Sequence, residues 1–147
     1  MDPSKSRDQE SGVSELSFLL DTDICSAYMK GSNAVYSRFI QYSGRLHIST
    51  VTLGELWAWV GRANASPRRL QTLLDLLQVV RVLPVDETVA RKFGEVRAWQ
   101  LDRGLSTPDL DFLNAVTALV HGFRLVTHNT SDYKNIPFLA LDDWLAP

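Results

Sequence analysis

The sequence predicts an α/β protein with a parallel sheet, and three observations support this. Short apolar runs rich in Val, Ile and Leu alternate along the chain with longer segments whose apolar residues recur at helical spacing. Most of the apolar runs are soon followed by a helix-start signal, as successive βαβ units require. The chain has 147 residues, of which 45% are apolar and 22% charged, and this is typical of one globular domain with a single core.

Five segments are predicted to be strands because they are short, apolar and bounded by turn residues. The third of them is rich in β-branched residues and is interrupted only by Arg81 and Pro84. The predicted strands span residues 18–20, 46–49, 79–85, 123–127 and 138–141.

Seven segments are predicted to be helices. Thr52 and Glu55 match a capping box at the start of one helix, and Asp86 is a suitable N-cap for the longest. The helix after Pro108 is the most apolar and is closed by Gly122, so we expect it to be the central one. The predicted helices span residues 23–30, 33–42, 52–62, 66–78, 87–104, 110–121 and 130–135.

Residues 1–16 are predicted to be a disordered tail, and residues 17–147 a single domain. The tail is polar, of mixed charge, and lacks the apolar stretch of a signal peptide. No apolar run approaches the ~20 residues that a membrane span requires. The one cysteine, Cys25, excludes an intrachain disulfide, which favours a reducing, cytoplasmic compartment.

Acidic or amide residues follow a strand or open a helix at four places. Asp21 follows the first predicted strand, and Glu55 comes shortly after the second. Asp111 lies in the first turn of the most apolar helix, and Asn129 and Asp132 follow the fourth strand. Because the carboxyl ends of parallel strands share the edge of a sheet where α/β proteins bind ligands, we expect these sites to converge.

Each of these residues has a structural explanation when it is taken alone. Asp21 or Asp23 can cap the first helix, and Glu55 can be the second member of the capping box. Asp111 is favoured in a first helical turn by the helix dipole, and Asn129 can cap the short helix that follows it. Only their joint occurrence indicates a functional site.

Several carboxylates at one sheet edge require a cation or a proton, because two of them about 4 Å apart repel by roughly 4 kcal/mol at an effective dielectric constant of about 20. Oxygen ligands without thiolate or histidine favour a hard ion, so the sequence predicts Mg²⁺ or Mn²⁺. Such an ion activates water and neutralises phosphoryl charge. We therefore expect metal-assisted hydrolysis of a phosphodiester without a protein nucleophile.

The net charge of −2 gives no overall attraction for a nucleic acid, so a nucleic-acid enzyme of this charge must concentrate its cations locally. His128, beside Asn129, is one candidate for contact with a phosphate. Two groups of cations are further candidates, although each group can also be a solvated helix face. They are Arg62, Arg68 and Arg69, and Arg91, Lys92, Arg97 and Arg103.

Taken together, the four sites resemble the motifs of PIN-domain ribonucleases. They are closest in form to the motifs of the VapC toxins of bacterial toxin–antitoxin pairs. The resemblance covers most of the predicted domain and implies a three-layer α/β/α sandwich with a central parallel sheet. It also implies an Mg²⁺- or Mn²⁺-dependent endoribonuclease that cleaves transfer or ribosomal RNA, forms a homodimer and is inhibited by a VapB-like antitoxin. The segments that match in order and spacing are residues 18–23, 48–56, 111–119 and 125–133.

By position within this resemblance, Asp21, Glu55 and Asp111 match the three principal acidic residues, which are the expected metal ligands. The fourth site stays open between Asn129 and Asp132, since the acid in this family can occupy either position. All five are candidate catalytic residues.

Two polar residues flank Asp111 in the sequence. Asp109 points elsewhere on a helix and is expected to belong to the helix start. Asn114 stands where the family usually has an aliphatic residue, and it lies on nearly the same helix face as Asp111. We expect Asn114 to bond either to the site or to the core.

Two alternative functions are kept at this point. The segment from Asp21 to Asp23 follows a strand and also resembles the nucleophile motif of haloacid-dehalogenase-like phosphatases, although the lysine and paired acids of such a site are not evident downstream. The second alternative is a PIN-like domain without metal that acts only as a binding module.

Overall fold

The computed structural model describes residues 16–147, and the tail predicted for residues 1–16 lies outside that range except for its last residue. In the described residues, five strands form one parallel sheet in the order β3-β2-β1-β4-β5. The predicted parallel sheet is therefore confirmed. The strands are β1 (Phe18–Leu20), β2 (Leu46–Ser49), β3 (Arg81–Leu83), β4 (Arg124–Val126) and β5 (Leu141–Asp142).

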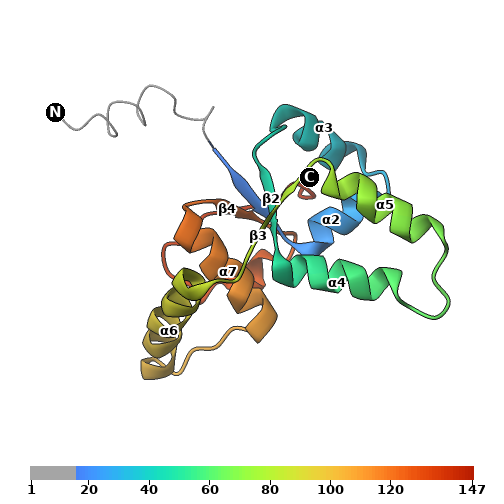
Figure 1. The fold of residues 1–147 in the computed structure, drawn as a ribbon. Helices are drawn as coiled ribbons and strands as arrows, with labels where there is room; N and C mark the ends of the chain where they lie inside the picture. Colours follow the sequence, from blue (N-terminus) through green and yellow to red (C-terminus); the bar gives the residue numbers. More distant parts are fainter. Residues whose placement is uncertain (1–15) are drawn as a thin grey trace.

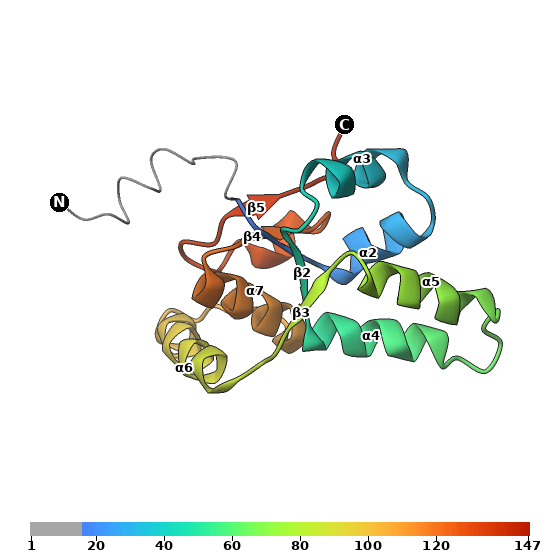
Figure 2. The same ribbon diagram turned by 45° about the horizontal axis from the view of Figure 1, so that its top comes forward.

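Helices cover both faces of this sheet, which confirms the three-layer arrangement. Figures 1 and 2 show α6 and α7 on one side and α2, α3, α4 and α5 on the other. No helix in the described part of the chain has the length and apolar character needed to cross a membrane. The helices are α2 (Thr22–Met29), α3 (Asn33–Gln41), α4 (Thr50–Val60), α5 (Arg68–Leu77), α6 (Glu87–Asp102), α7 (Asp109–His121) and the 3-10 helix η2 (Thr130–Tyr133).

Two apolar cores lie on opposite faces of the sheet because side chains alternate along each strand. In β1, Phe18 and Leu20 pack with residues of α2 to α5, whereas Leu19 packs with residues of α6 and α7. Trp144 near the carboxyl terminus is 5% exposed and closes the first core against the ring of Phe18. All three residues of β1 are buried, as expected of a central parallel strand.

The strand order creates a switch point between β1 and β4. The chain moves outward from β1 to β2 and β3, and then crosses to the other side of β1 to form β4 and β5. Leu20 of β1 is paired with Val126 of β4, so Asp21 and Thr127 leave the sheet side by side at its carboxyl edge. Open α/β sheets bind their ligands at this place.

The start of α4 differs from the prediction. The helix begins at Thr50, two residues earlier than expected, and its N-cap is Ser49, whose hydroxyl accepts from the backbone N–H of Thr52 at 3.1 Å. The capping box predicted for Thr52 and Glu55 is therefore wrong. The β2 strand runs directly into the helix, so its last residue serves as the cap.

The last strand also lies later in the chain than predicted. Phe138, expected to begin it, is 98% exposed and has a positive φ of 64°, which a strand does not allow. Pairing with β4 places the strand at Leu141–Asp142. There the guanidinium of Arg124 donates to both carboxylate oxygens of Asp142, at 2.8 and 3.0 Å. This cross-strand contact, more than local apolarity, sets the register.

The glycine that ends α7 provides a test of the fold. Gly122 has a φ of 68°, and a β-carbon there would meet no atom within 4 Å. Gly122→Ala is expected to lower the free energy of unfolding by about 1 kcal/mol. The cause is that the left-handed backbone at this position disfavours any residue with a β-carbon, whereas the surrounding space is open. The matched change Gly94→Ala, in the interior of α6 with equally open space, should raise it by about 0.5 to 1 kcal/mol. Urea unfolding of both variants measures the difference, and equal shifts in one direction would contradict this account of the α7 terminus.

Candidate active site

Asp21, which directly follows β1, is the most enclosed acid of the site, and it is 8% exposed. Its Oδ1 accepts from the backbone N–H of Thr22 at 2.9 Å and from Nδ2 of Asn114 at 3.3 Å. Its Oδ2 accepts from the Thr127 hydroxyl at 3.0 Å and the Tyr133 hydroxyl at 2.7 Å. The first bond makes Asp21 the N-cap of α2. The other three come from distant elements, which capping alone does not explain.

Asn114 connects α7 to the start of α4 and to Asp21. It is 1% exposed, and its Nδ2 also donates to the Thr52 hydroxyl at 3.2 Å. Its Oδ1 accepts from the Ser49 hydroxyl. A buried amide must satisfy both its donors and its acceptor, and these three partners do so. The expectation that Asn114 bonds to the site or to the core is confirmed, since its partners belong to both.

Asp111 lies in the first turn of α7 and shares a local electric field with the other acids. Burial raises the pKa of its carboxyl above the ordinary value of 3.8, and the charges of Asp21, Asp132 and Glu55 raise it further. A hydrogen bond from the Tyr133 hydroxyl, 3.4 Å from Oδ1, lowers the pKa and opposes these effects. The charges of three other predicted acids therefore act on Asp111, and Asp21 and Asp111 both contact the Tyr133 hydroxyl.

Glu55 extends from the exposed side of α4 toward the start of α2. Its Oε1 accepts from the Thr22 hydroxyl at 2.7 Å. Because Ser49 caps α4, Glu55 has no part in capping that helix. The helix-capping explanation for Glu55 is therefore wrong. Its carboxylate instead lies beside Thr22, the residue that follows Asp21.

The two candidates for the fourth position lie in different surroundings. The Asn129 side chain donates to Oδ2 of Asp23 at 3.4 Å, and its backbone N–H donates to the Thr127 hydroxyl at 3.2 Å. Asn129 precedes η2 but makes no side-chain cap, so the capping explanation for it is wrong. Asp132, in η2, is exposed and acts on the pKa of Asp111. Of the two, Asp132 is therefore the one coupled to the acidic cluster.

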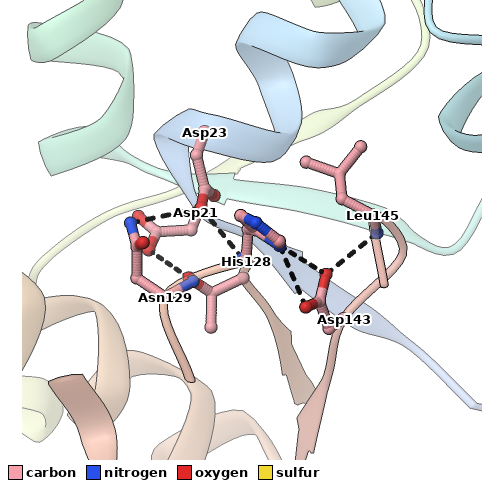
Figure 3. A network of polar contacts seen from close by, with 7 residues as sticks. Asp21, Asp23, His128, Asn129, Asp143 and Leu145 are labelled. Carbon is pink, nitrogen blue, oxygen red and sulfur yellow. Dashed lines mark hydrogen bonds and ion pairs between the residues drawn. The ribbon is translucent and has the colours of Figure 1, made fainter. Parts of the chain in front are cut away.

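Asp23 anchors the loop that follows β4 (Figure 3). Its Oδ2 accepts from the backbone N–H of His128 at 2.9 Å, and the His128 ring contacts the carboxylate of Asp143 at 3.0 Å. Asp143 also accepts from the backbone N–H of Leu145 at 2.9 Å. Burial raises the pKa of Asp23, and its Oδ1 is buried without a hydrogen-bond partner in the described residues. This network joins the start of α2 to the carboxyl-terminal segment.

The donor set suits a hard divalent cation, because the four acids that converge offer only carboxylate oxygens. Within the part of the chain that the structure describes, no three His, Cys, Asp or Glu side chains are already arranged to hold a metal ion. Protein donors occupy both oxygens of Asp21, and the Tyr133 hydroxyl contacts Asp21 and Asp111 together. The residues fit such an ion by their chemistry, and binding at Asp21 would require a hydrogen bond to be released.

Sequence reasoning missed two of the residues that contact Asp21. Thr127 follows β4 as Asp21 follows β1, so the strand pairing is the signal that could have identified it. Tyr133 follows Asp132 and is 1% exposed, with its ring in the core formed by α6 and α7. Nothing in the sequence distinguishes the Tyr133 hydroxyl from that of any other core tyrosine.

The two groups of cations that were candidates for phosphate contacts have different surroundings in the structure. In the first group, the Arg69 guanidinium donates to the carbonyl oxygen of Trp59 at 2.8 Å and stacks over its ring, while Arg62 and Arg68 are exposed. All members of the second group lie on α6 or at its end. Arg91, Lys92 and Arg103 fit the solvated-face explanation, whereas the Arg97 side chain is 19% exposed and packs over the rings of Phe93 and Phe112. The contacts are Arg91 with Glu87, Lys92 with Glu95, Arg97 with Asp109, and Arg103 over Trp99.

Known proteins resemble the chain in both sequence and structure. The tRNA(fMet)-specific endonuclease VapC of Shigella flexneri is 32% identical over 130 residues, covering 88% of this chain and 98% of that protein. The protein of the same name from Salmonella typhimurium is 29% identical with the same coverage. The VapBC2 structure from Rickettsia felis, bound to a promoter DNA fragment, matches with a TM-score of 0.81 and 25% identity, covering 88% of this chain and 99% of that one.

The family follows from the breadth of these matches. DNA-bound VapBC from Salmonella typhimurium superimposes with a TM-score of 0.80 at 28% identity, covering 88% of this chain and 98% of that one. The sequence model of the PIN domain matches residues 18–139, which include Asp21, Glu55, Asp111 and Asp132. This excludes the haloacid-dehalogenase-like alternative. The chain belongs to the PIN-domain family, and it has relatives named VapC ribonuclease or endonuclease at 25–32% identity.

Proposed function

We propose that this protein is a VapC-type toxin, an Mg²⁺- or Mn²⁺-dependent endoribonuclease that a cognate antitoxin inhibits. The observation that carries the proposal is the convergence of Asp21, Glu55, Asp111 and Asp132 at the switch point of a PIN-domain sheet. The names of its relatives, endonuclease and ribonuclease, support the reaction type. The cytoplasm, which contains transfer RNA and ribosomes, is the proposed compartment.

Asp21, Glu55 and Asp111 are the proposed metal ligands, and Asp132 is the proposed fourth acid. The chemistry that Mg²⁺ or Mn²⁺ supplies in such a site is the activation of water and the neutralisation of charge on a phosphoryl group. Three carboxylates without histidine or thiolate match the preference of these ions for oxygen. No side chain is needed as a nucleophile.

The surrounding polar residues hold the acids in place. Asn114 and Thr127 fix the two oxygens of Asp21, and the Thr22 hydroxyl holds Glu55. Asn129, which is bonded to Asp23, is assigned to the support of the loop after β4 and not to the reacting centre. Because these partners are hydrogen-bonded before substrate arrives, the acids are preorganised.

The proposed substrate is a structured RNA, with transfer RNA favoured because two relatives are named for tRNA(fMet). The chain has a net charge of −2, so binding depends on local cations. Arg62 and Arg68 are exposed between α4 and α5, and the His128 side chain, 55% exposed, lies at the rim of the site. These residues are the proposed contacts with RNA phosphates.

The proposed partner is a VapB-like antitoxin bound between α2, α3 and α5. A hollow of ≈ 270 Å³ lies over α2, α4 and α5, and one of ≈ 540 Å³ adjoins it over α2, α3 and α5. Met29 and Thr72 line both hollows, and apolar Tyr36 is 54% exposed beside them. The lining combines apolar side chains such as Met29 with charged ones such as Lys30 and Asp75, and a groove with apolar anchors accepts an amphipathic helix. The similar structures from Rickettsia felis and Salmonella typhimurium are VapBC assemblies bound to DNA, which supports a VapB-like partner. A homodimer is also proposed, by analogy with the family.

A binding module without catalysis is the second candidate function. The observation that favours it is the saturation of Asp21 by four protein donors. Metal-dependent RNA cleavage by the purified protein separates the two candidates, since a pure binding module would show none.

Replacement of Asp111 tests the metal site. Asp111→Asn should reduce RNA cleavage by about 10²-fold or more. The pKa of Asp111 is raised above 3.8, so folding favours its protonated form over its ionised form. The stability that protonated Asp111 contributes is therefore lost as the pH rises through this raised pKa. The metal-free variant should therefore be at least as stable as the parent at neutral pH. Asp109→Asn, in the same helical turn but exposed and paired with Arg97, is the control and should cleave normally. Equal cleavage by both variants would reject the assignment.

The chemistry of the cut ends tests the nucleophile. Attack by water leaves a 5′-phosphate on one fragment and a 3′-hydroxyl on the other, whereas attack by the 2′-hydroxyl of the RNA leaves a 2′,3′-cyclic phosphate. We expect the first pair, measured by mass spectrometry of the fragments. The same digest with Asp111→Asn controls for contaminating ribonucleases. A cyclic phosphate in the parent digest alone would overturn the proposed mechanism.

A bulky cation in the shared wall of the two hollows tests the partner site. Thr72→Arg should weaken the complex with the proposed VapB-like antitoxin by at least about tenfold, because the arginine side chain fills the groove. Thr88→Arg makes the same change on α6, in the opposite layer, and should leave the complex intact. Co-purification and calorimetry measure both, with RNA cleavage as the check on folding. Undiminished binding by Thr72→Arg would place the antitoxin elsewhere.

A further inference from the structure

Tyr133 places its hydroxyl within reach of two acids of the site. The hydroxyl lies 2.7 Å from Oδ2 of Asp21 and 3.4 Å from Oδ1 of Asp111. A phenolic hydroxyl keeps its proton at neutral pH, and both neighbouring groups are carboxylates, so the Tyr133 hydroxyl acts as a donor. Since it has one proton, it donates to one carboxylate at a time. The shorter distance identifies Asp21 as the main acceptor.

The carboxylate of Asp21 has no acceptor position to spare. Two oxygens offer about four lone-pair positions, and four donors occupy them. A cation that binds Asp21 must therefore displace a donor. The four donors differ in how firmly other contacts hold them.

Three of these donors are fixed by other contacts. The Thr22 donor is a backbone N–H at the start of α2. Asn114 also bonds to α4 and β2, and the Thr127 hydroxyl also accepts from the loop after β4. Only the Tyr133 hydroxyl contacts Asp21 and Asp111 together, in the described part of the chain. It lies where a cation shared by these two acids would also need to contact their oxygens.

We propose that the Tyr133 hydroxyl is a clamp that stands in for the cation between Asp21 and Asp111 in the metal-free protein and competes with the metal for Asp21. This rests on the metal site of the proposed function. The clamp stabilises the metal-free acids with a hydrogen bond and weakens metal binding by the same interaction. Tyr133 is thus a positioning residue that sets the metal affinity of the site.

Tyr133→Phe tests the clamp because it removes the hydroxyl and keeps the ring that packs in the core. The melting temperature of the metal-free variant in EDTA should fall by roughly 3 °C or more. Its dissociation constant for Mn²⁺, measured by calorimetry, should fall about tenfold, since the metal no longer displaces a donor. A merely structural role predicts a lower melting temperature together with weaker Mn²⁺ binding. Tighter Mn²⁺ binding by Tyr133→Phe is therefore the result that identifies the clamp.

Tyr28→Phe is the matched control. The Tyr28 ring stacks on Phe39 in the layer on the other face of the sheet, so its Mn²⁺ affinity should equal that of the parent. Mn²⁺ binding by the parent that is equal to or tighter than that of Tyr133→Phe would overturn the clamp alone. Absence of Mn²⁺ binding in both proteins would overturn the clamp and the metal-dependent function together.

Discussion

The burial of the Asp21 carboxylate is the constraint on which the site depends. A carboxylate that is 8% exposed at the end of a central strand needs hydrogen-bond donors from the protein. One comes from the start of α2, directly after Asp21. The other three come from the middle of α7, the residue after β4, and η2, which are at least 93 residues away in the sequence. Satisfying one side chain thereby fixes the relative positions of all four elements at the carboxyl edge of the sheet.

The charge interactions at the same sheet edge are unfavourable in the metal-free protein, as is typical of functional sites. Burial and three neighbouring acids raise the pKa of Asp111, so the metal-free protein holds that carboxylate at a cost. The Tyr133 hydroxyl relieves part of the cost through its contacts with both Asp21 and Asp111. The hydrogen bonds that stabilise the buried carboxylates without a metal are the ones that a metal would replace. The stability of the metal-free protein and its metal affinity are therefore coupled.

Local patterns in the sequence were sufficient for most of the fold. The predicted strands at residues 18–20 and 46–49 coincide with β1 and β2, and Asp86 and Gly122 bound their helices as expected. The error in the last strand arose because a distant partner decides its position. The position of β5 depends on pairing with β4 and on the contact between Arg124 and Asp142, which no local pattern shows.

The sequence by itself determined that Asp21 follows a strand and that Asp111 lies in the first turn of a helix, and it predicted that these acids and Glu55 lie at one edge of the sheet. Only the tertiary structure showed the different surroundings of Asn129 and Asp132: the Asn129 amide donates to Asp23, whereas the charge of Asp132 acts on Asp111. The physical reason is that hydrogen bonds and charge interactions act through space. Tyr133 reaches Asp21 across a sequence separation of 112 residues, a contact that only the packed core brings about.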